Sequence, residues 1–301
     1  ELFVLFSYTQ VLGLPGSLAG LALFIAMLVD AFADPAIGAF SDNLRNSRLG
    51  RRHTLMFIAP LPLGLALAAV FMPPDNLGQW ALFGWLTATT VTVRFLCGLY
   101  IVPYSAQLAE LTRDPAERAS LQLYKSVAQT LFDSAMLALA FNVFFIKKPD
   151  GSGGQSDAST YFPFALTLAT ALILTTTLSA LGTWRKMRAI EREGEAHHPA
   201  TGGSLRAHLS PRAILGSWRK VLFGNPNIRA LILGALLTAM ATSVMRSLAS
   251  HLGIFFWELT PQQIGYWQQS AIPGFFAGMI IARLTAKRVE LIRMIQISLA
   301  L

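Results

Sequence analysis

The stretch "DAFADPAIGAFSDNLRNSRLGRR", residues 30–52, decides the fold, because it sets two acids at the end of a long apolar run. The run begins near Leu18, and the acids are Asp30 and Asp34. About 20 apolar residues in a row are enough for a helix to cross a bilayer. A charged side chain at the bilayer centre costs about 2.5–3.5 kcal/mol on insertion scales, so such residues are rare and usually face a cavity. The stretch therefore predicts a transmembrane helix with two carboxylates near the midplane, followed by a basic loop.

The composition places the whole chain in the membrane. Its 301 residues are 53% hydrophobic and only 13% charged, whereas soluble domains carry about 25% charged residues. The net charge of +8 would suggest nucleic acid as a partner for a soluble protein. Here the basic residues lie in short loops between apolar runs, so we expect the lipid bilayer, and no nucleic acid, as the partner. We also expect a monomer, and no cofactor other than a coupling ion.

Apolar runs of spanning length recur along the chain and predict an all-α membrane protein. The predicted spans are 18–41, 53–71, 80–104, 121–146, 161–184, 227–250 and 262–284, with a partial span at 2–14 before them and another beginning near Leu291. We number these spans 1 to 9 in chain order and expect an N-terminal bundle at 1–184, a cytoplasmic linker at 185–226 and a partial second bundle at 227–301. Because the chain opens and stops inside apolar segments, we interpret it as part of a longer protein.

The positive charge alternates between loops. Most of the 24 Lys and Arg residues lie in or beside loops 2–3, 4–5, 6–7 and 8–9, while the intervening loops carry almost none. Cytoplasmic loops carry the excess of Lys and Arg in membrane proteins. We therefore expect these four loops to face the cytoplasm, and a short amphipathic helix at 211–223 within the linker.

The spacing of the two acids predicts a site for a small cation. Residues four apart share a helical face, with Cβ atoms about 5–6 Å apart. Two carboxylates that close in a low dielectric favour either a cation between them or a proton on one of them. Asp30 and Asp34 are thus candidates for coupling to H⁺ or Na⁺, and Pro35 frees the carbonyl of Ala31 from its helical hydrogen bond. The alternative is that basic residues on neighbouring helices compensate the two acids.

The quoted stretch resembles the second helix and following loop of the glycoside–pentoside–hexuronide cation symporters, a branch of the major facilitator superfamily. A second similar passage is "YIVPYSAQLAELTRDPAERASLQLYK", residues 100–125, and a weaker one is "SYTQVLGLP". The resemblance implies a bacterial inner-membrane protein with a major-facilitator-type helical bundle of two six-helix halves. This chain would then run from the end of helix 1 to the start of helix 9.

By this resemblance Asp30 and Asp34 are the cation-site acids. The resemblance also implies a cytoplasmic gating motif, whose members here are Gly38, Asp42, Arg45, Arg48, Gly50, Arg51 and Arg52. The chain departs from the sugar permeases at three positions: Ala33 and Gly98 stand where those proteins carry Asn and Thr, and Ile101 where they carry a sugar-binding Asp. Na⁺ loses two oxygen ligands by these changes, whereas a proton needs only one carboxylate.

Other polar groups lie within the predicted spans. Gln122, Ser126, Gln129 and Asp133 recur at helical spacing and predict a polar stripe facing a water-filled path. Arg94 is expected to pair with Asp133 or with the acids of span 2; alternatively Arg94 or Arg246 binds a substrate carboxylate, as in a uronide. Candidates for sugar stacking and hydroxyl hydrogen bonds are Tyr8, Gln10, Tyr100, Trp267 and Gln268.

Together these features predict a secondary active transporter that couples H⁺ or Na⁺ to symport of a sugar, glycoside or uronide by alternating access. One alternative is a carrier of lysolipids or other amphipathic solutes from the same superfamily. Another is a non-transporting membrane sensor or scaffold. We do not expect an enzyme, because the sequence places no nucleophile–base pair or metal-ligand cluster at membrane depth. The only metal we expect is a Na⁺ ion at Asp30 and Asp34, should Na⁺ be the coupling ion.

Overall fold

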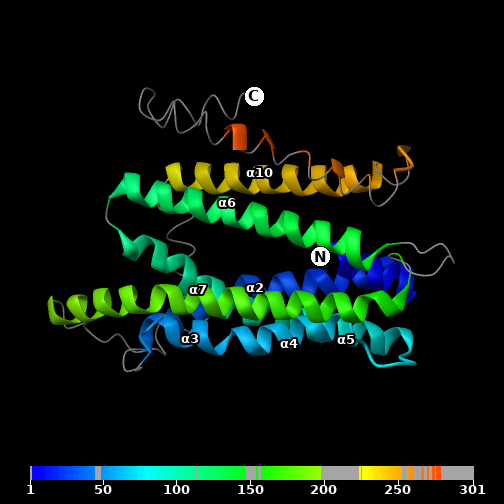
Figure 1. Ribbon diagram of the computed structural model, residues 1–301, viewed down its shortest axis with the longest axis horizontal. Coiled ribbons are helices and arrows are strands. Elements are labelled where there is room, and N and C mark those ends of the chain that lie inside the picture. Colours follow the sequence, from blue (N-terminus) through cyan, green and yellow to red (C-terminus); the bar gives the residue numbers. More distant parts are fainter. Residues whose placement is uncertain are drawn as a thin grey trace. The chain divides into compact units, whose positions relative to one another are not determined.

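The computed structural model describes most of the chain up to His251 and scattered residues beyond it (Figure 1). The described stretches are 2–44, 49–112, 114–146, 157–197 and 226–252, with Gly154, Gly224 and single residues between 256 and 278. The chain forms two compact units: the first contains residues 1–126 and 144–235, and the second contains 127–143 and 236–301.

Every regular element in the described stretches is helical, as predicted from the apolar runs. The elements are α1 (Leu2–Phe6), the π-helix η1 (Ser7–Val11), α2 (Gly16–Asn43), α3 (His53–Ile58), α4 (Pro60–Val70), α5 (Gln79–Leu111), α6 (Pro115–Leu139), the π-helix η2 (Ala140–Phe144), the 3₁₀-helix η3 (Ala158–Thr160), α7 (Tyr161–His197) and α10 (Pro226–His251). The all-α class is therefore confirmed.

Four of these helical segments are long and apolar enough to cross a membrane: Gly16–Ser41, Gln79–Gln107, Ser120–Phe144 and Ala158–Ile190. Their large apolar side chains point outward as well as inward. Phe32 on α2 and Leu178 on α7 are each about two-thirds exposed, and so is Leu65 on the shorter apolar helix α4. Soluble monomers rarely expose apolar surface on this scale, so these faces fit contact with lipid.

The predicted span at 53–71 consists of two helices, α3 and α4, in place of one. Pro60 and Pro62 lack backbone N–H groups, so the carbonyls of Met56 and Ile58 lose their usual helical donors. Ala59 between the two helices keeps helical dihedral angles, φ −68° and ψ −38°. The chain therefore continues in nearly the same direction, although the hydrogen-bond ladder is interrupted.

Aromatic packing closes one end of the first unit. Phe164 of α7 lies with its ring centroid 5.0–5.9 Å from those of Phe3, Phe71 and Phe145, in the edge-to-face or tilted geometry that aromatic pairs prefer. Phe145 and Tyr161 are almost fully buried in the same cluster. These rings join α1, the end of α4, the segment after η2 and the start of α7.

The opposite end of the unit is held by polar contacts. The indole N–H of Trp184 on α7 donates to the carbonyl of Leu49 at 2.7 Å. The His53 ring of α3 lies 3.0 Å from the Thr183 hydroxyl of α7. The loop between α2 and α3 is thereby attached to α7.

Several predicted features fall outside the described residues. Helix α7 continues to His197, so the first part of the predicted linker is helical. The predicted amphipathic helix at 211–223 and the partial span from Leu291 lie outside the described stretches, as does most of the predicted span at 262–284.

Candidate functional site

The two acids of α2 face α5 in a regular register. Asp30 contacts Arg94, Asp34 lies against Gly98, and Gly38 lies against Val102. In each pair the two residues are 64 positions apart, and successive pairs are one helical turn apart. From one pair to the next the residue number rises by four on both helices, so α2 and α5 run parallel. A row of residues spaced four apart on α2 therefore packs against a similar row on α5.

Arg94 and Asp30 form an ion pair inside the span. The guanidinium Nη1 donates to Oδ2 of Asp30 at 3.3 Å, and the two side chains are 32% and 26% exposed. Of the two partners that the sequence suggests for Arg94, the structure shows one of the α2 acids. One of the two carboxylates is therefore compensated by an internal positive charge.

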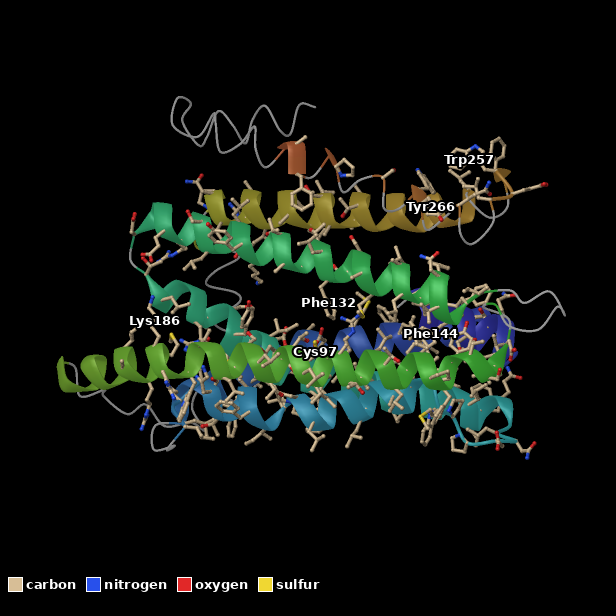
Figure 2. The ribbon with its side chains drawn as sticks, in the orientation of Figure 1. Cys97, Phe132, Phe144, Lys186, Trp257 and Tyr266 are labelled. Carbon is tan, nitrogen blue, oxygen red and sulfur yellow. The ribbon has the colours of Figure 1, made fainter. Side chains whose placement is uncertain are left out.

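Asp34 occupies the space that Gly98 leaves open. A Cβ atom at position 98 would lie 2.7 Å from Oδ1 of Asp34 and 3.1 Å from Cδ1 of Ile37. Contacts below 3.0 Å are essentially never seen for real Cβ atoms. The glycine thus leaves room for the carboxylate. Figure 2 labels Cys97, the residue that precedes Gly98 on α5.

Both helices contain a proline close to these residues. Pro35 lies inside α2 and Pro103 inside α5. Since proline has no N–H, the carbonyls of Ala31 and Leu99 lose their usual helical donors. Polar backbone atoms are therefore available beside the acids on both helices.

Two of the candidate sugar-binding residues, Tyr8 and Tyr100, are buried between helices, and their hydroxyls bond to backbone carbonyls. Tyr8 in η1 is fully buried, and its hydroxyl donates to the Val70 carbonyl at 2.7 Å. Tyr100 is 7% exposed, and its hydroxyl donates to the Thr176 carbonyl at 3.0 Å. Gln10, also in η1, is exposed and is the more accessible candidate.

The remaining candidates lie elsewhere in the chain. On α6 the side chains of Gln122, Gln129 and Asp133 are exposed and that of Ser126 is partly buried. That this stripe faces a water-filled path stays a prediction. In the second unit Trp267 is 38% exposed and meets Trp257 edge-on at 5.4 Å between ring centroids. Arg246 lies on α10, but its side chain and all of Gln268 are outside the described residues.

The structure describes only part of the predicted cytoplasmic gating motif, which begins in α2 and continues into the loop before α3. Gly38 takes part in the α2–α5 register, and Asp42 lies in the last turn of α2. Gly50 has φ +102°, a conformation that glycine adopts far more readily than other residues. Arg51 is partly buried and Arg52 is 9% exposed. Arg45, Arg48 and the Asp42 side chain are outside the described residues.

A buried polar cluster joins α3, α5 and α7, and the sequence reasoning did not identify it. His53 is 1% exposed and Gln107 is 2% exposed. The Gln107 amide nitrogen lies 2.8 Å from the Met56 sulfur and 3.5 Å from the His53 ring. The only signal in the sequence is a His and a Gln at the boundaries of apolar runs, which does not indicate that they meet.

Metal ligation at the α2 acids would depend on few protein groups. Among the residues that the structure describes, no three or more His, Cys, Asp or Glu side chains are grouped so that they could hold a metal ion. A hard cation prefers six or more oxygen ligands, typically at about 2.0–2.6 Å. A metal ion at Asp30 and Asp34 would have to obtain most of its ligands from backbone carbonyls or water.

Comparison with known proteins identifies the family. The family described as "MFS/sugar transport protein" matches residues 1–300. The chain is 31% identical over 130 residues to the inner membrane symporter YicJ of Escherichia coli (strain K12), covering 43% of this chain and 28% of that protein. It is 30% identical over 214 residues to the uncharacterized symporter sll1374 of Synechocystis sp., and the match covers 69% of this chain and 36% of that protein.

A third relative carries a named sugar substrate. The isoprimeverose transporter of Lactiplantibacillus pentosus is 27% identical over 169 residues, covering 56% of this chain and 34% of that protein. The chain thus spans about a third of the length of these relatives, and no solved structure matches it. The apolar helices, the acids within α2 and the match over nearly the whole chain agree: this integral membrane protein belongs to the MFS/sugar transport family.

Proposed function

We propose that the full-length protein is a secondary active transporter that couples a downhill cation, H⁺ or Na⁺, to symport of a sugar, glycoside or uronide. The observation that carries this proposal is the Asp34 carboxylate, which lies within a membrane-length helix and against a glycine of the neighbouring helix. Ionisable groups at membrane depth usually belong to ion or substrate pathways. The matched relatives are named as symporters or sugar transporters, so a small-molecule substrate is favoured over an enzymatic reaction.

Coupling follows from linkage between the two binding events. A cation that binds Asp34 more tightly when substrate is present increases substrate affinity by the same factor. The two bundles of the protein then rock around a midplane site to expose it to either side. The basic loops, including the one between α2 and α3, face the cytoplasm in this proposal.

The substrate class is supported by the family and by the polar groups on the helices. Gln10, Gln129 and Asp133 are exposed and offer hydrogen bonds to sugar hydroxyls. A uronide would in addition need a cationic side chain, and a guanidinium binds a carboxylate in a bidentate fork. Since Arg94 already contacts Asp30 at 3.3 Å, Arg246 is the better candidate for that role.

The test is uptake of a panel of sugars, glycosides and uronides by the full-length protein in membrane vesicles. We expect accumulation driven by an imposed pH gradient or Na⁺ gradient, and its loss in Asp34→Asn with normal amounts of protein in the membrane. Exchange of preloaded substrate without a gradient should survive in the variant, because binding itself is retained. Concentrative uptake by Asp34→Asn equal to that of the wild type would contradict the coupling role. Uptake only of lysolipids would favour the amphipathic-solute alternative.

A further inference from the structure

The ion pair of Arg94 with Asp30 bears on which cation drives transport. We propose that the Arg94 guanidinium takes the place of a metal ion at the α2 acids, and that Gly98 completes a site suited to a proton alone. Arg94 is then the residue that determines ion specificity. This inference rests on the proposed cation-coupled function, and it narrows the coupling ion to H⁺.

The charge balance of the site is the first argument. Asp30, Asp34 and Arg94 together carry one net negative charge when all three are ionised, so a single monovalent cation neutralises them, and the place of the guanidinium decides between a proton and Na⁺. A metal ion bridging both acids would lie beside the guanidinium, which is 3.3 Å from Oδ2 of Asp30. Two unit positive charges about 4 Å apart, at an effective dielectric of about 20, repel enough to weaken binding by roughly 100- to 1000-fold.

The supply of oxygen ligands is the second argument, and it is independent of charge. Ala33 and Gly98, which stand next to Asp34 in sequence and in space, have no side-chain oxygen. The missing Cβ of Gly98 lets Oδ1 of Asp34 come so close to α5 that a side chain there would collide with it. A metal ion needs several oxygens around it, whereas a proton needs one carboxylate oxygen.

Access to the site fits a proton that comes and goes. Asp34 is an exposed side chain in the structure, although it lies within a span, so the packing of α2 against α5 leaves its carboxylate uncovered. The charged or titratable groups around it on α2 and α5 are Asp30, Arg94 and the Cys97 thiol. Because Arg94 is paired with Asp30 one turn away, Asp34 is the carboxyl left to bind and release the proton.

The decisive experiment measures Na⁺ binding directly, without any substrate. Purified full-length protein is titrated with ²²Na⁺ as wild type, Arg94→Ala and Arg94→Lys. We expect saturable Na⁺ binding by the Arg94→Ala protein, at least tenfold tighter than the upper limit that the wild type sets, because removing the guanidinium leaves two uncompensated acids. Arg94→Lys retains the charge and should behave as the wild type. Arg229→Ala, which removes an exposed arginine of α10, is the matched control and should leave Na⁺ binding as it is in the wild type.

A second measurement uses the unmodified protein, so that it does not depend on the folding of a variant. Uptake by the wild type should respond to a pH gradient and be the same with and without Na⁺. The role of Arg94 would be overturned by saturable Na⁺ binding to the wild type or by stimulation of its uptake by Na⁺. It would also be overturned if a folded Arg94→Ala protein bound Na⁺ no more tightly than the wild type. Failure of the proposed function is distinguishable: no substrate would then be accumulated under any gradient, while the ²²Na⁺ comparison would still decide the ion specificity.

Discussion

Gly98 of α5 and Asp34 of α2 are in such close contact that a single methyl group at position 98 would collide with the carboxylate, 2.7 Å from Oδ1. The two residues are 64 positions apart in the chain and meet because α2 and α5 run parallel in register. A residue that looks like a lost ligand in the sequence therefore leaves the space that the Asp34 carboxylate occupies in this structure.

Gly98→Ala should displace Asp34 and reduce gradient-driven uptake by about tenfold or more, since a misplacement of about 1 Å in a functional group can have effects of this size. The matched control is Gly84→Ala on the same helix, where an added Cβ meets nothing within 4 Å. Uptake and the amount of protein in the membrane are measured for both variants. Equal activity of the two variants would show that the approach of Asp34 to α5 has no functional importance.

Tyr8→Phe should lower stability and leave sugar affinity unchanged, because the hydroxyl is used within the fold. The change leaves the Val70 carbonyl without the donor that now lies 2.7 Å away, a loss of about 1–3 kcal/mol. Thermal unfolding in detergent measures the first effect, and the apparent KM for uptake measures the second. Tyr124→Phe, at an exposed tyrosine, serves as the control for removing a hydroxyl. A raised KM at unchanged stability would instead assign Tyr8 to the substrate.

Gly50→Ala should destabilise the loop between α2 and α3, because φ is +102° at that position. The expected cost is about 1 kcal/mol or more, seen as a lower unfolding temperature. Gly78→Ala is the control: Gly78 precedes α5 with φ −64°, and an added Cβ there meets nothing within 4 Å. If Gly50→Ala impairs transport without lowering stability, the loop has a role in switching that backbone strain alone does not explain.

Reporter fusions test the proposed orientation of the loops. A reporter inserted between α2 and α3 should signal a cytoplasmic location, because that loop carries four arginines, whereas one inserted between η2 and η3 should signal the other side. Alkaline phosphatase and green fluorescent protein fusions give complementary readouts. The same signal from both insertion sites would contradict the alternation of charge on which the orientation depends.

Most of the helices could be predicted from the sequence because hydropathy is a local property. The predicted span at 18–41 lies within α2 (Gly16–Asn43), and that at 227–250 lies within α10 (Pro226–His251). The break between α3 and α4 was missed, although its cause is visible in the sequence. Two prolines at the start of α4 interrupt the hydrogen-bond ladder within an apolar run that has uniform hydropathy.

The candidate site was predictable in its chemistry and not in its pairings. Two acids four residues apart in an apolar run already indicate a shared helical face at membrane depth. The sequence leaves the partner of Arg94 open between Asp133 and the α2 acids, because nothing local distinguishes them. It also leaves Tyr8 among the sugar-binding candidates, since an aromatic side chain in a short segment gives no indication of whether it is buried.

The sequence by itself determined that this chain is an all-helical membrane protein, that α2 carries two acids four residues apart in an apolar run, and that basic loops alternate with loops that have few basic residues. These properties depend on composition and on spacing within one helix. Only the tertiary structure decided that Arg94 neutralises Asp30 and that Gly98 makes room for Asp34. The physical reason is that the register of two parallel helices is set by how their side chains interlock along the whole contact, a property that neither helix contains alone.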